Sequence, residues 1–356
     1  MTVFTNHAFD KHQLLCFAND PETGLNAIIA IHNTNRGPAL GGCRFWNYQN
    51  EQEAINDVLR LSRGMTYKSA LANLKLGGGK AVIIGDPKEI KTPQLMQAFG
   101  RFVDKLNGLY ITAEDVGTSP TDMENIHTET NHVVGLENNN GGSGDPSIFT
   151  AYGVYIGIKT SHQKRTGKTS LSGAKVALQG LGHVGTYLLK HLLDNGAEVI
   201  VADINKDHVD AITKQYGVKS VDANQILFEE CDILSPCALG GVINDQTINK
   251  LNCKVIAGAA NNQLLDVRHG DLLKERGILY APDYLINAGG LINVSYEGAN
   301  YDALAVETHV NGIHDTLMEI YDLAEEKNIS SNRASDMVAE SRFMNSSNEQ
   351  NQRITA

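Results

Sequence analysis

The second half of the sequence alternates short apolar runs with helical patterns, and this alternation constrains the fold more than any other feature. A short apolar run predicts a buried strand, and apolar residues three or four positions apart predict a helix. Strands that alternate with helices indicate a parallel, doubly wound α/β sheet. The expected strands are 175–179, 198–202, 232–235, 254–257 and 278–281, and the expected helices of this region are 150–160, 185–195, 207–216, 307–326 and 332–342.

One turn of this region carries a glycine pattern that is typical of dinucleotide binding. In "VALQGLGHVG", Gly180, Gly182 and Gly185 follow an expected strand and open an expected helix. An acidic residue, Asp203, lies 23 positions after Gly180, at the end of the next strand. The first glycine allows a tight turn, the second lets a pyrophosphate approach the helix N-terminus, and the third allows close packing of helix on strand. The other members of the turn are Leu181, His183 and Val184.

Asp203 bears on the choice of cofactor. Its carboxylate can accept hydrogen bonds from a ribose 2′-hydroxyl and would repel a 2′-phosphate, which favours NAD over NADP. Lys206 lies close by in the sequence, so NADP stays open. A glycine-rich turn that binds no ligand is the alternative. The same turn also serves proteins that bind other dinucleotides, so it does not identify a reaction.

The first half of the sequence mixes strands and helices without regular alternation. The expected strands are 25–33, 80–84 and 108–115, and the expected helices are 51–61 and 95–106. The stretch "ENNNGGSGDP", from Glu137 to Pro146, has no apolar periodicity and predicts a loop at a domain boundary. A surface loop within one domain is the alternative.

Length, charge and cysteines limit the class of protein. A chain of 356 residues suits two domains, and a net charge of −11 argues against general nucleic-acid binding and against binding to anionic membranes. Five scattered cysteines without a CxxC pair fit a reducing compartment. The N-terminus does not have the pattern of a secretory signal, and no apolar segment approaches the ~18 residues of a membrane span. We therefore expect a cytoplasmic protein.

The segment "LKLGGGKAVIIGDP" places three glycines directly before Lys80 and an apolar run. A phosphate-binding P-loop would need GxxxxGK followed by serine or threonine, and Leu74 and Ala81 break that pattern. A structural lysine at the start of a strand is the simple alternative. Lys68, on an expected helix twelve residues upstream, and Asp115, at the end of the strand in "YITAED", favour a shared site instead.

Two lysines and an aspartate suit a small zwitterionic or carboxylate substrate. One lysine could hold a carboxylate as a fixed cation. The other, if it is buried near a second positive charge, could release its proton near neutral pH and act as a general acid and base. The twelve histidines show no HExxH or other ligand spacing, so we expect no metal site.

Six segments together resemble the amino-acid dehydrogenases of the glutamate, leucine, phenylalanine and valine dehydrogenase superfamily, with the leucine dehydrogenases nearest within it. The segments are "GPALGG", "MTYKSALANLKLGGGKAVI", "YITAEDVG", "GLGHVG", "AGAANNQL" and "PDYLINAGGLINV". They occur in the family order between about Leu40 and Val294. The glycine–lysine segment and "AANNQL" are specific to the family, whereas the dinucleotide turn is not.

The resemblance implies a two-domain α/β fold with the active site in the cleft between the domains. It implies a mixed-sheet domain for catalysis, substrate binding and oligomerisation at 1–145 and a Rossmann-type NAD-binding domain at 146–325. A C-terminal helix and tail at 326–356 would return toward the first domain. The family works by opening and closing, and "NNNGGSGDP" is the expected hinge region. Relatives assemble as dimers to octamers, so a homo-oligomer is expected.

The implied reaction converts an L-amino acid, NAD and water reversibly into a 2-keto acid, ammonia and NADH. Lys80 matches the catalytic lysine, which activates the water that attacks the iminium carbon. Lys68 matches the residue that anchors the substrate carboxylate, and Asp115 matches the residue that handles the amino-group proton. Asn261 or Asn262 would fix the substrate carboxylate or the catalytic water.

The resemblance also assigns residues to the walls of the site. Aliphatic residues would line the side-chain pocket, which suits leucine, isoleucine or valine, although simple core packing is the alternative for them. An enzyme for phenylalanine or another aromatic amino acid stays open, as does a non-catalytic NAD-binding sensor. The pocket residues are Leu40, Ala113, Leu291 and Val294, the residues beside the substrate backbone are Gly41, Gly77 and Gly78, and those at the nicotinamide end are Thr150 and Asn287.

Overall fold

The computed structural model describes residues 3–136 and 143–354, with side chains as far as residue 344. The chain forms two compact units. The first comprises Met1–Gly144, Val294–Asp302 and Ala339–Ala356, and the second comprises Asp145–Asn293 and Ala303–Val338. Residues 137–142, which make up most of the loop predicted as a domain boundary and hinge, lie outside the described residues.

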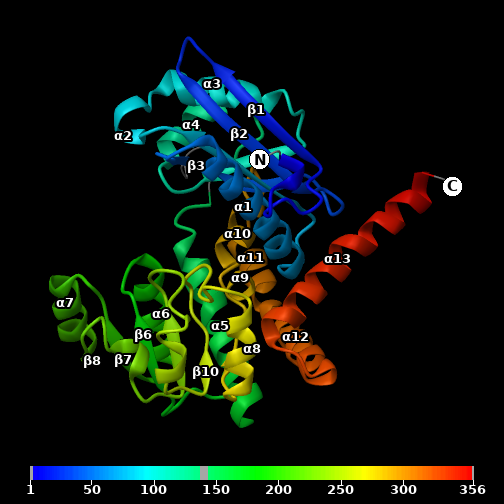
Figure 1. Ribbon diagram of the computed structural model, residues 1–356. Helices are drawn as coiled ribbons and strands as arrows, with labels where there is room; N and C mark the ends of the chain where they lie inside the picture. Colours follow the sequence, from blue (N-terminus) through cyan, green and yellow to red (C-terminus); the bar gives the residue numbers. More distant parts are fainter. Residues whose placement is uncertain (1–2, 137–142, 355–356) are drawn as a thin grey trace. The chain divides into compact units, whose positions relative to one another are not determined.

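Five strands form a mixed sheet in the first unit: β1 (Leu14–Asp20), β2 (Leu25–Asn33), β3 (Ala39–Trp46), β4 (Gly77–Ile84) and β5 (Tyr110–Glu114). Their order is β1-β2-β4-β3-β5. Figure 1 labels β1, β2 and β3 of this sheet. β2 is antiparallel to both β1 and β4, whereas β3 is parallel to both β4 and β5. The remaining elements of residues 3–136 are η1 (Val3–Thr5), α1 (Glu51–Leu71), α2 (Pro87–Ile90), α3 (Pro93–Asp104) and α4 (Pro120–His127).

Helix α1 covers one face of this sheet. Its N-terminus is capped by Asn50, whose side chain accepts a hydrogen bond from Glu53 N at 3.0 Å. Four α1 residues, Ala54, Ile55, Val58 and Leu59, pack against alternate residues of the sheet, Ile28, Ala30 and Val82. Side chains alternate between the two faces of a strand, so even-numbered residues of β2 and β4 face α1.

The other face of the sheet is covered by α3 and α4. The odd-numbered residues of β2 and β4, among them Ile29, Ile31, Ala81 and Ile83, pack there with Leu95, Phe99, Val103, Met123 and Ile126. Thr92 caps α3 by accepting a hydrogen bond from Leu95 N, and Pro93 occupies the first helical turn, where its missing N–H costs nothing. The sheet is therefore buried on both faces.

Six strands form a fully parallel sheet in the second unit: β6 (Lys175–Gln179), β7 (Glu198–Ala202), β8 (Lys219–Ser220), β9 (Ile233–Pro236), β10 (Val255–Ile256) and β11 (Leu279–Tyr280). Their order is β11-β10-β9-β6-β7-β8, and all pairs are parallel. The chain runs from β6 outward to β8 and then returns to build β9 to β11 on the other side of β6. Ligands of such sheets bind at this point of reversal, beside the carboxyl ends of the central strands.

The second unit also contains most of the helices of residues 143–354. They include α5 (Ser147–Thr166), α6 (His183–Asp194), α7 (Lys206–Tyr216), η3 (Ile226–Phe228), η4 (Ile248–Lys250), α8 (Arg268–Glu275), α9 (Asp283–Ile286), α10 (Gly289–Ser295), α11 (Ala303–Asn311), α12 (Ile313–Lys327) and α13 (Ser331–Ile354). The residues of α13 from Ala339 onward belong to the first unit.

The predicted fold class, a mixed sheet followed by a doubly wound parallel sheet, is confirmed. Three boundaries differ in an instructive way. The helix expected at 51–61 continues to Leu71. The apolar pattern did not predict this full length, because the second half buries the polar residues Ser62, Thr66 and Ser69. The helix expected at 307–326 is two helices separated by Gly312. The strand expected from Lys80 begins three residues earlier, within the glycines.

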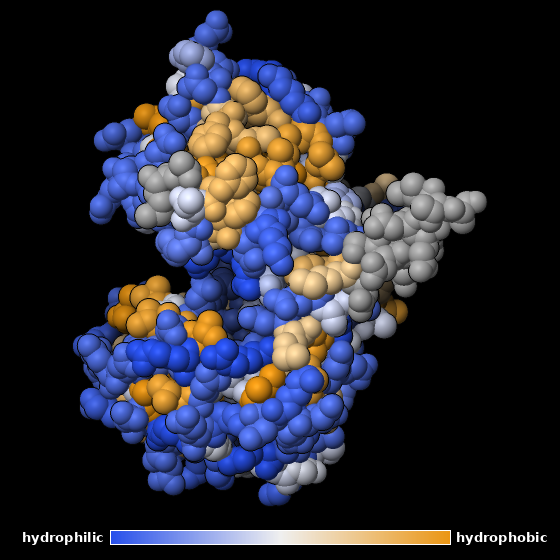
Figure 2. All heavy atoms as spheres, turned by 45° about the vertical axis from the view of Figure 1, so that its right-hand side comes forward, coloured by the Kyte–Doolittle hydropathy of each residue, from blue (hydrophilic) through white to orange (hydrophobic). Residues whose placement is uncertain are grey.

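Large apolar side chains are exposed on both units, as the orange areas of Figure 2 indicate. Those more than half exposed include Phe4, Phe17, Trp46 and Leu109 in the first unit and Ile204, Leu239, Leu265, Val267 and Leu304 in the second. No helix within 3–136 and 143–354 combines the length and the apolar character that crossing a membrane requires.

A leucine pair on helices of the second unit tests this description of the core. Leu273 on α8 is fully buried among Ile256, Ile278 and Tyr280, whereas Leu304 on α11 is 70% exposed. We expect Leu273→Ala to lower the free energy of unfolding by about 2–5 kcal/mol, since it removes buried apolar contacts and leaves a cavity. Leu304→Ala is the control and should change it by less than about 0.5 kcal/mol. Urea unfolding followed by circular dichroism measures both.

Candidate active site

Lys80 is the fourth residue of β4, so it lies within the strand and not at its start, as the sequence had suggested. It pairs with Ala30 of β2, and it points to the same face as Val82, which packs against α1. Only 6% of Lys80 is exposed. A lysine buried to this degree needs a charged or hydrogen-bonding partner, because an isolated ammonium is costly to remove from water.

Asp115, directly after β5, provides that partner. Lys80 Nζ lies 2.8 Å from Asp115 Oδ2. Burial alone would raise the pKa of the Asp115 carboxyl group, but Lys80 and the neighbouring Arg44 outweigh burial, and the pKa is lowered. The aspartate is therefore ionised at neutral pH and holds the lysine amine in one place. The structure brings these two predicted residues together.

Two predicted pocket residues share the face of the sheet on which Lys80 lies. Leu40 of β3 pairs with Gly78 of β4, and Ala113 of β5 pairs with Gly42 of β3. Paired residues of neighbouring strands point to the same side, so these side chains face the same way as Lys80. Leu40 is buried and Ala113 is partly buried.

The glycines around Lys80 allow close packing of the backbone. A Cβ atom added to Gly41 would lie 1.7 Å from Gly79 O, and one added to Gly77 would lie 2.0 Å from Asn33 O. A Cβ on Gly78 would lie 2.0 Å from the backbone nitrogen of Thr66 in α1. The structure thus gives these glycines a packing function, and their contact with a substrate stays a prediction.

Lys68 lies in the last turn of α1 and is partly buried. The carboxyl end of this helix is held by α13. Arg342 donates hydrogen bonds from Nη1 to the carbonyl oxygens of Ala70 and Leu71, and Tyr67 donates to Glu340 Oε1 at 2.8 Å. These contacts satisfy carbonyl groups that a helix terminus leaves unpaired, and they fix the turn that carries Lys68.

The sequence interpretation missed Arg44 and Asp57, which lie beside Asp115. Arg44 Nε lies 3.1 Å from Asp115 Oδ2, and Arg44 Nη1 lies 2.7 Å from Asp57 Oδ2. One signal could have found the aspartate. Asp57 and Lys68 are eleven residues apart on α1, which is about three full turns, so both lie on the same side of the helix.

The predicted dinucleotide turn lies between β6 and α6 in the second unit. Gly180 has a φ of +94°, which favours glycine, and Gly182 caps α6 without a side-chain hydrogen bond. A Cβ on Gly185 would lie 2.0 Å from Gly180 O, so this glycine is required for the helix to approach the turn. Leu181 is buried, Val184 is partly buried, and the side chain of His183 is exposed.

Asp203 lies at the end of β7 and is held by two backbone N–H groups. Leu181 N donates to its Oδ2 at 2.7 Å, and Asn205 N donates to its Oδ1 at 2.9 Å. The carboxylate is thus oriented beside the turn without any ligand. Charge-assisted hydrogen bonds of this kind are stronger than neutral ones.

These residues fit a dinucleotide. A Cβ on Gly182 would meet no atom within 4 Å, so the N-terminus of α6 is open to a phosphate. The turn lies at the reversal point of the sheet, and Asp203, at the end of the next strand, has the position at which such sites carry an acidic residue; its contact with a ribose stays a prediction.

The other predicted site residues lie around two short segments and α10, and the asparagines among them form a small polar group. Asn287 donates from Nδ2 to Asn261 Oδ1 at 2.8 Å and to Ala259 O at 3.1 Å. Asn262, with a φ of +53°, is exposed next to them. Thr150 Oγ1 donates to Pro146 O, so the structure gives it a local hydrogen bond at the start of α5. Leu291 is buried in α10, and Val294, in the same helix, is partly buried and belongs to the first unit.

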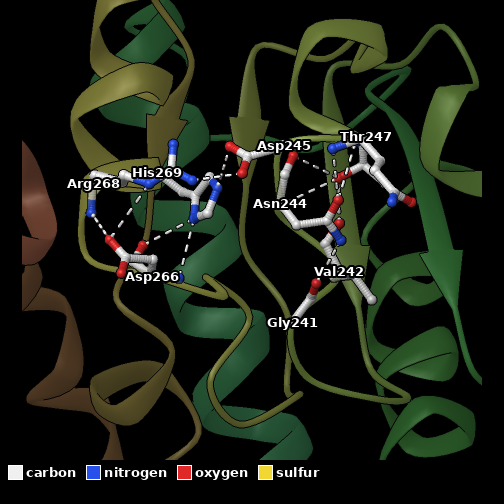
Figure 3. Close-up of polar contacts among 9 residues, drawn as sticks. Gly241, Val242, Asn244, Asp245, Thr247, Asp266, Arg268 and His269 are labelled. Atoms are coloured by element: carbon white, nitrogen blue, oxygen red, sulfur yellow. Dashed lines mark hydrogen bonds and ion pairs between the residues drawn. The ribbon is translucent and has the colours of Figure 1, made fainter.

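A polar cluster supports the loop after β9, as Figure 3 shows for Gly241, Val242, Asn244 and Thr247. This loop packs against Asn261. Asn244 donates to Gly241 O at 2.8 Å, and Thr247 Oγ1 donates to Val242 O at 2.6 Å. A Cβ on Gly240 in this loop would lie 2.4 Å from Asn261 O. These hydrogen bonds are internal to the turn, so we assign the cluster a structural function.

Within the described ranges, no group of three or more His, Cys, Asp or Glu side chains could hold a metal ion.

Comparison with known proteins identifies the family. Residues 12–132 match the model of the Glu/Leu/Phe/Val dehydrogenase dimerisation domain, and residues 141–209 and 201–350 match the Glutamate/Leucine/Phenylalanine/Valine dehydrogenase model. The chain belongs to this family. The resemblance drawn from the sequence is therefore confirmed, and the chain is an amino-acid dehydrogenase, an oxidoreductase of a family that depends on a nicotinamide dinucleotide.

Several members of the family are similar over nearly the whole chain. Leucine dehydrogenases of Thermoactinomyces intermedius and Geobacillus stearothermophilus are each 52% identical over 335 residues, which is 94% of this chain and 91% of theirs. A phenylalanine dehydrogenase of Caldalkalibacillus thermarum is 47% identical over 96% of this chain and 94% of its own. The crystal structure of L-tryptophan dehydrogenase from Nostoc punctiforme has a TM-score of 0.85 and 44% identity over 94% of this chain and 97% of that chain.

Two glycines of the dinucleotide turn allow packing and ligand binding to be separated. Gly182→Ala should leave the thermal stability of this dehydrogenase unchanged but weaken NADH binding, because the added methyl group enters space left open for phosphate. Gly185→Ala should lower both, since its Cβ meets backbone at 2.0 Å. We expect a loss of about 1–3 kcal/mol in stability for Gly185→Ala only. Thermal unfolding and NADH fluorescence titration measure the two quantities, and equal stability losses in both variants would contradict this assignment.

Proposed function

We propose that the protein catalyses the reversible NAD-dependent oxidative deamination of aliphatic branched-chain L-amino acids: leucine, isoleucine and valine. The products are the 2-keto acid, ammonia and NADH. The observation that carries the proposal is the buried contact between Lys80 Nζ and Asp115 Oδ2, at 2.8 Å. A protein that only senses metabolites has no need for a lysine buried in this way beside a carboxylate.

The reaction needs a group that can hold and release a proton next to the substrate α-carbon. Lys80 suits this task because its amine is fixed by Asp115 and largely removed from water. We assign Lys80 the activation of the attacking water and Asp115 the transfer of the amino-group proton. We assign Lys68 the anchoring of the substrate carboxylate, and Asn261 or Asn262 the fixing of the carboxylate or the water.

The cofactor supplies one chemical step, the acceptance of a hydride from the substrate α-carbon when it is bound. NAD is favoured over NADP because Asp203 presents its carboxylate beside the turn, where a 2′-phosphate would meet negative charge. We infer that the turn from Gly180 to Gly185 binds the pyrophosphate, and that Thr150 and Asn287 contact the nicotinamide end. Catalysis therefore draws on residues of both units.

The substrate preference rests on the pocket residues and on the relatives. Leu40 and Ala113 are aliphatic and lie on the face of Lys80, and Leu291 and Val294 are the other aliphatic candidates. Leucine dehydrogenases are 52% identical to this chain, against 47% for phenylalanine dehydrogenases. A preference for aromatic amino acids is the second candidate, because one similar solved structure is a tryptophan dehydrogenase.

We further propose a division of labour along the chain. Residues 1–145 would serve catalysis, substrate binding and oligomerisation, residues 146–325 would bind NAD, and residues 326–356 would complete the first domain. A homo-oligomer of two to eight subunits is supported by the match to a dimerisation domain and by exposed apolar side chains such as Phe17 and Trp46. The five free cysteines favour the cytoplasm.

A substrate panel tests the proposed function. NADH absorbance is followed with L-leucine, L-phenylalanine and L-glutamate, each with NAD and with NADP. We expect kcat/KM to be highest for L-leucine with NAD, by about tenfold or more over L-phenylalanine, because pocket shape discriminates by a few kcal/mol at most. Faster turnover of phenylalanine would favour the second candidate. No turnover of any amino acid would refute the proposal.

Substitution of the buried lysine tests its role. We expect Lys80→Ala and Lys80→Met to reduce kcat by about 100-fold or more, the range that a general acid–base group contributes. NADH binding should be unchanged, since the dinucleotide turn belongs to the other unit. The methionine variant preserves side-chain volume and guards against misfolding. Lys75→Ala, at an exposed lysine five residues earlier, is the matched control and should retain wild-type turnover.

A further inference from the structure

A chain of alternating charges extends from Lys80 away from the predicted site residues. Asp115 Oδ2 is shared by two cations: Lys80 Nζ at 2.8 Å and Arg44 Nε at 3.1 Å. The guanidinium of Arg44 uses a second nitrogen, Nη1, to contact Asp57 Oδ2 at 2.7 Å. The order of charges is therefore lysine, aspartate, arginine, aspartate, and each neighbour is of opposite sign.

Asp57 is itself held by two further groups. Tyr48 donates its hydroxyl to Asp57 Oδ2 at 2.8 Å, and Arg60 Nη2 lies 2.9 Å from Asp57 Oδ1. Burial and the nearby Asp57 carboxylate raise the pKa of Tyr48, so the phenol keeps its proton and remains a donor. Both oxygens of Asp57 are thus occupied, and the carboxylate has one orientation toward Arg44.

The chain of charges joins β3, β4, α1 and the residue that follows β5 on one face of the sheet. Arg44 of β3 pairs with Val82 of β4, so it points to the α1 face, as Lys80 does. Asp57 lies on α1, and Asp115 follows β5. The side chains of Arg44 and Asp57 are only partly exposed, at 22% and 15%. Water and salt therefore screen the attraction between them less than they screen a surface ion pair.

We propose that Arg44 is a positioning residue for the reaction: anchored by Asp57, it holds Asp115 Oδ2 against Lys80 Nζ. This inference rests on the proposed function, because it assigns Arg44 a role in the chemistry of Lys80. Arg44 acts through Asp115 and does not contact the lysine in the described side-chain contacts. Its rigid guanidinium suits the task, since two nitrogens in a fixed geometry can bind two carboxylates at once.

The charge of Arg44, as well as its geometry, affects the protonation of Lys80. Without Arg44, Lys80 would be the only cation among the described side chains in contact with Asp115. The negative charge of Asp115 would then stabilise the ammonium form of the lysine more strongly. Without the charge of Asp57, Arg44 would be less neutralised and would disfavour that ammonium form. The two losses therefore act on Lys80 in opposite directions. A salt bridge that only ties α1 to the sheet would show no such opposition.

Other titratable groups surround the pair and are left intact by these changes. On the far side of the sheet, burial raises the pKa of the Cys43 thiol and of the Tyr110 phenol, so both remain uncharged near neutral pH. The remaining charged neighbours are Glu114, next to Asp115; Asp122, which contacts Lys91 at 2.8 Å; and Lys68 and Arg60 on α1. They are common to every variant compared below.

The experiment compares Arg44→Gln, Arg44→Lys and Asp57→Asn in the full-length protein. The readout is the pH profile of kcat/KM for oxidative deamination of L-leucine with NAD, where the rate rises as a base loses its proton. We expect the acid limb to move to higher pH in Arg44→Gln and to lower pH in Asp57→Asn, each by about half a pH unit or more. We expect kcat of Arg44→Gln to fall about 10- to 100-fold with KM little changed, because the substrate is not contacted.

Arg44→Lys separates charge from geometry. It keeps the positive charge, so its acid limb should stay at the wild-type pH, while its kcat recovers only in part because a lysine cannot bind both carboxylates in one plane. Arg63→Gln is the matched control. It breaks another α1 ion pair, Arg63 Nε to Asp10 Oδ2 at 2.8 Å, and should leave the pH profile unchanged.

The outcomes distinguish this inference from the proposed function. If the wild type turns over no amino acid, the proposed function fails. If the wild type is active and folded Arg44→Gln and Asp57→Asn shift in the same direction, or not at all, only the role of Arg44 is overturned. If Asp57→Asn does not fold, as thermal unfolding would show, the comparison of Arg44→Gln with Arg44→Lys decides, and identical profiles overturn the inference.

Discussion

The contact between Lys80 and Asp115 is the interaction on which the first unit depends. Removing an ammonium from water is tolerated only if an opposite charge and hydrogen bonds replace the lost solvent. Asp115 supplies that charge at 2.8 Å and shares the same oxygen with Arg44, whose own charge is balanced by Asp57. Around this pair, β3, β4, β5 and α1 must all keep their register, because each contributes one charged side chain.

Glycine makes such a crowded arrangement possible. α1 approaches β4 so closely at Gly78 that any side chain there would meet the backbone of Thr66. This approach brings the helix that carries Asp57 and Lys68 directly onto the face that carries Lys80. Of the three consecutive glycines before Lys80, Gly78 is therefore the one that lets the helix lie against the strand, while Gly77 and Gly79 lie against Asn33 and Tyr110. The cost is a strand with little side-chain packing of its own, which the neighbouring strands and α1 offset.

Much of the fold was readable from the sequence. The strands of the parallel sheet follow from apolar runs, and residues 175–179 and 198–202 match β6 and β7. The second half of α1 was readable only in part: Lys68 was expected on a helix, but the buried residues Ser62, Thr66 and Ser69 are polar and interrupt the apolar pattern. The pairing of Lys80 with Asp115 could be expected from strand ends and family motifs. The contact of Arg44 with Asp115 could not, since it depends on strand register, which a single sequence does not specify; for Asp57, helical spacing indicates only that it lies on the same side of α1 as Lys68.

The contacts of α13 with α1 have a consequence for synthesis of the chain. Arg342 lies 272 residues after Ala70, and Glu340 lies 273 residues after Tyr67, yet they complete the carboxyl end of a helix that begins at Glu51. The turn bearing Lys68 therefore cannot reach its final form on the ribosome until Arg342 has emerged. A nascent chain that stops before Glu340 would lack the contacts that complete this helix end, so the turn that carries Lys68 is finished only after these late residues have been made.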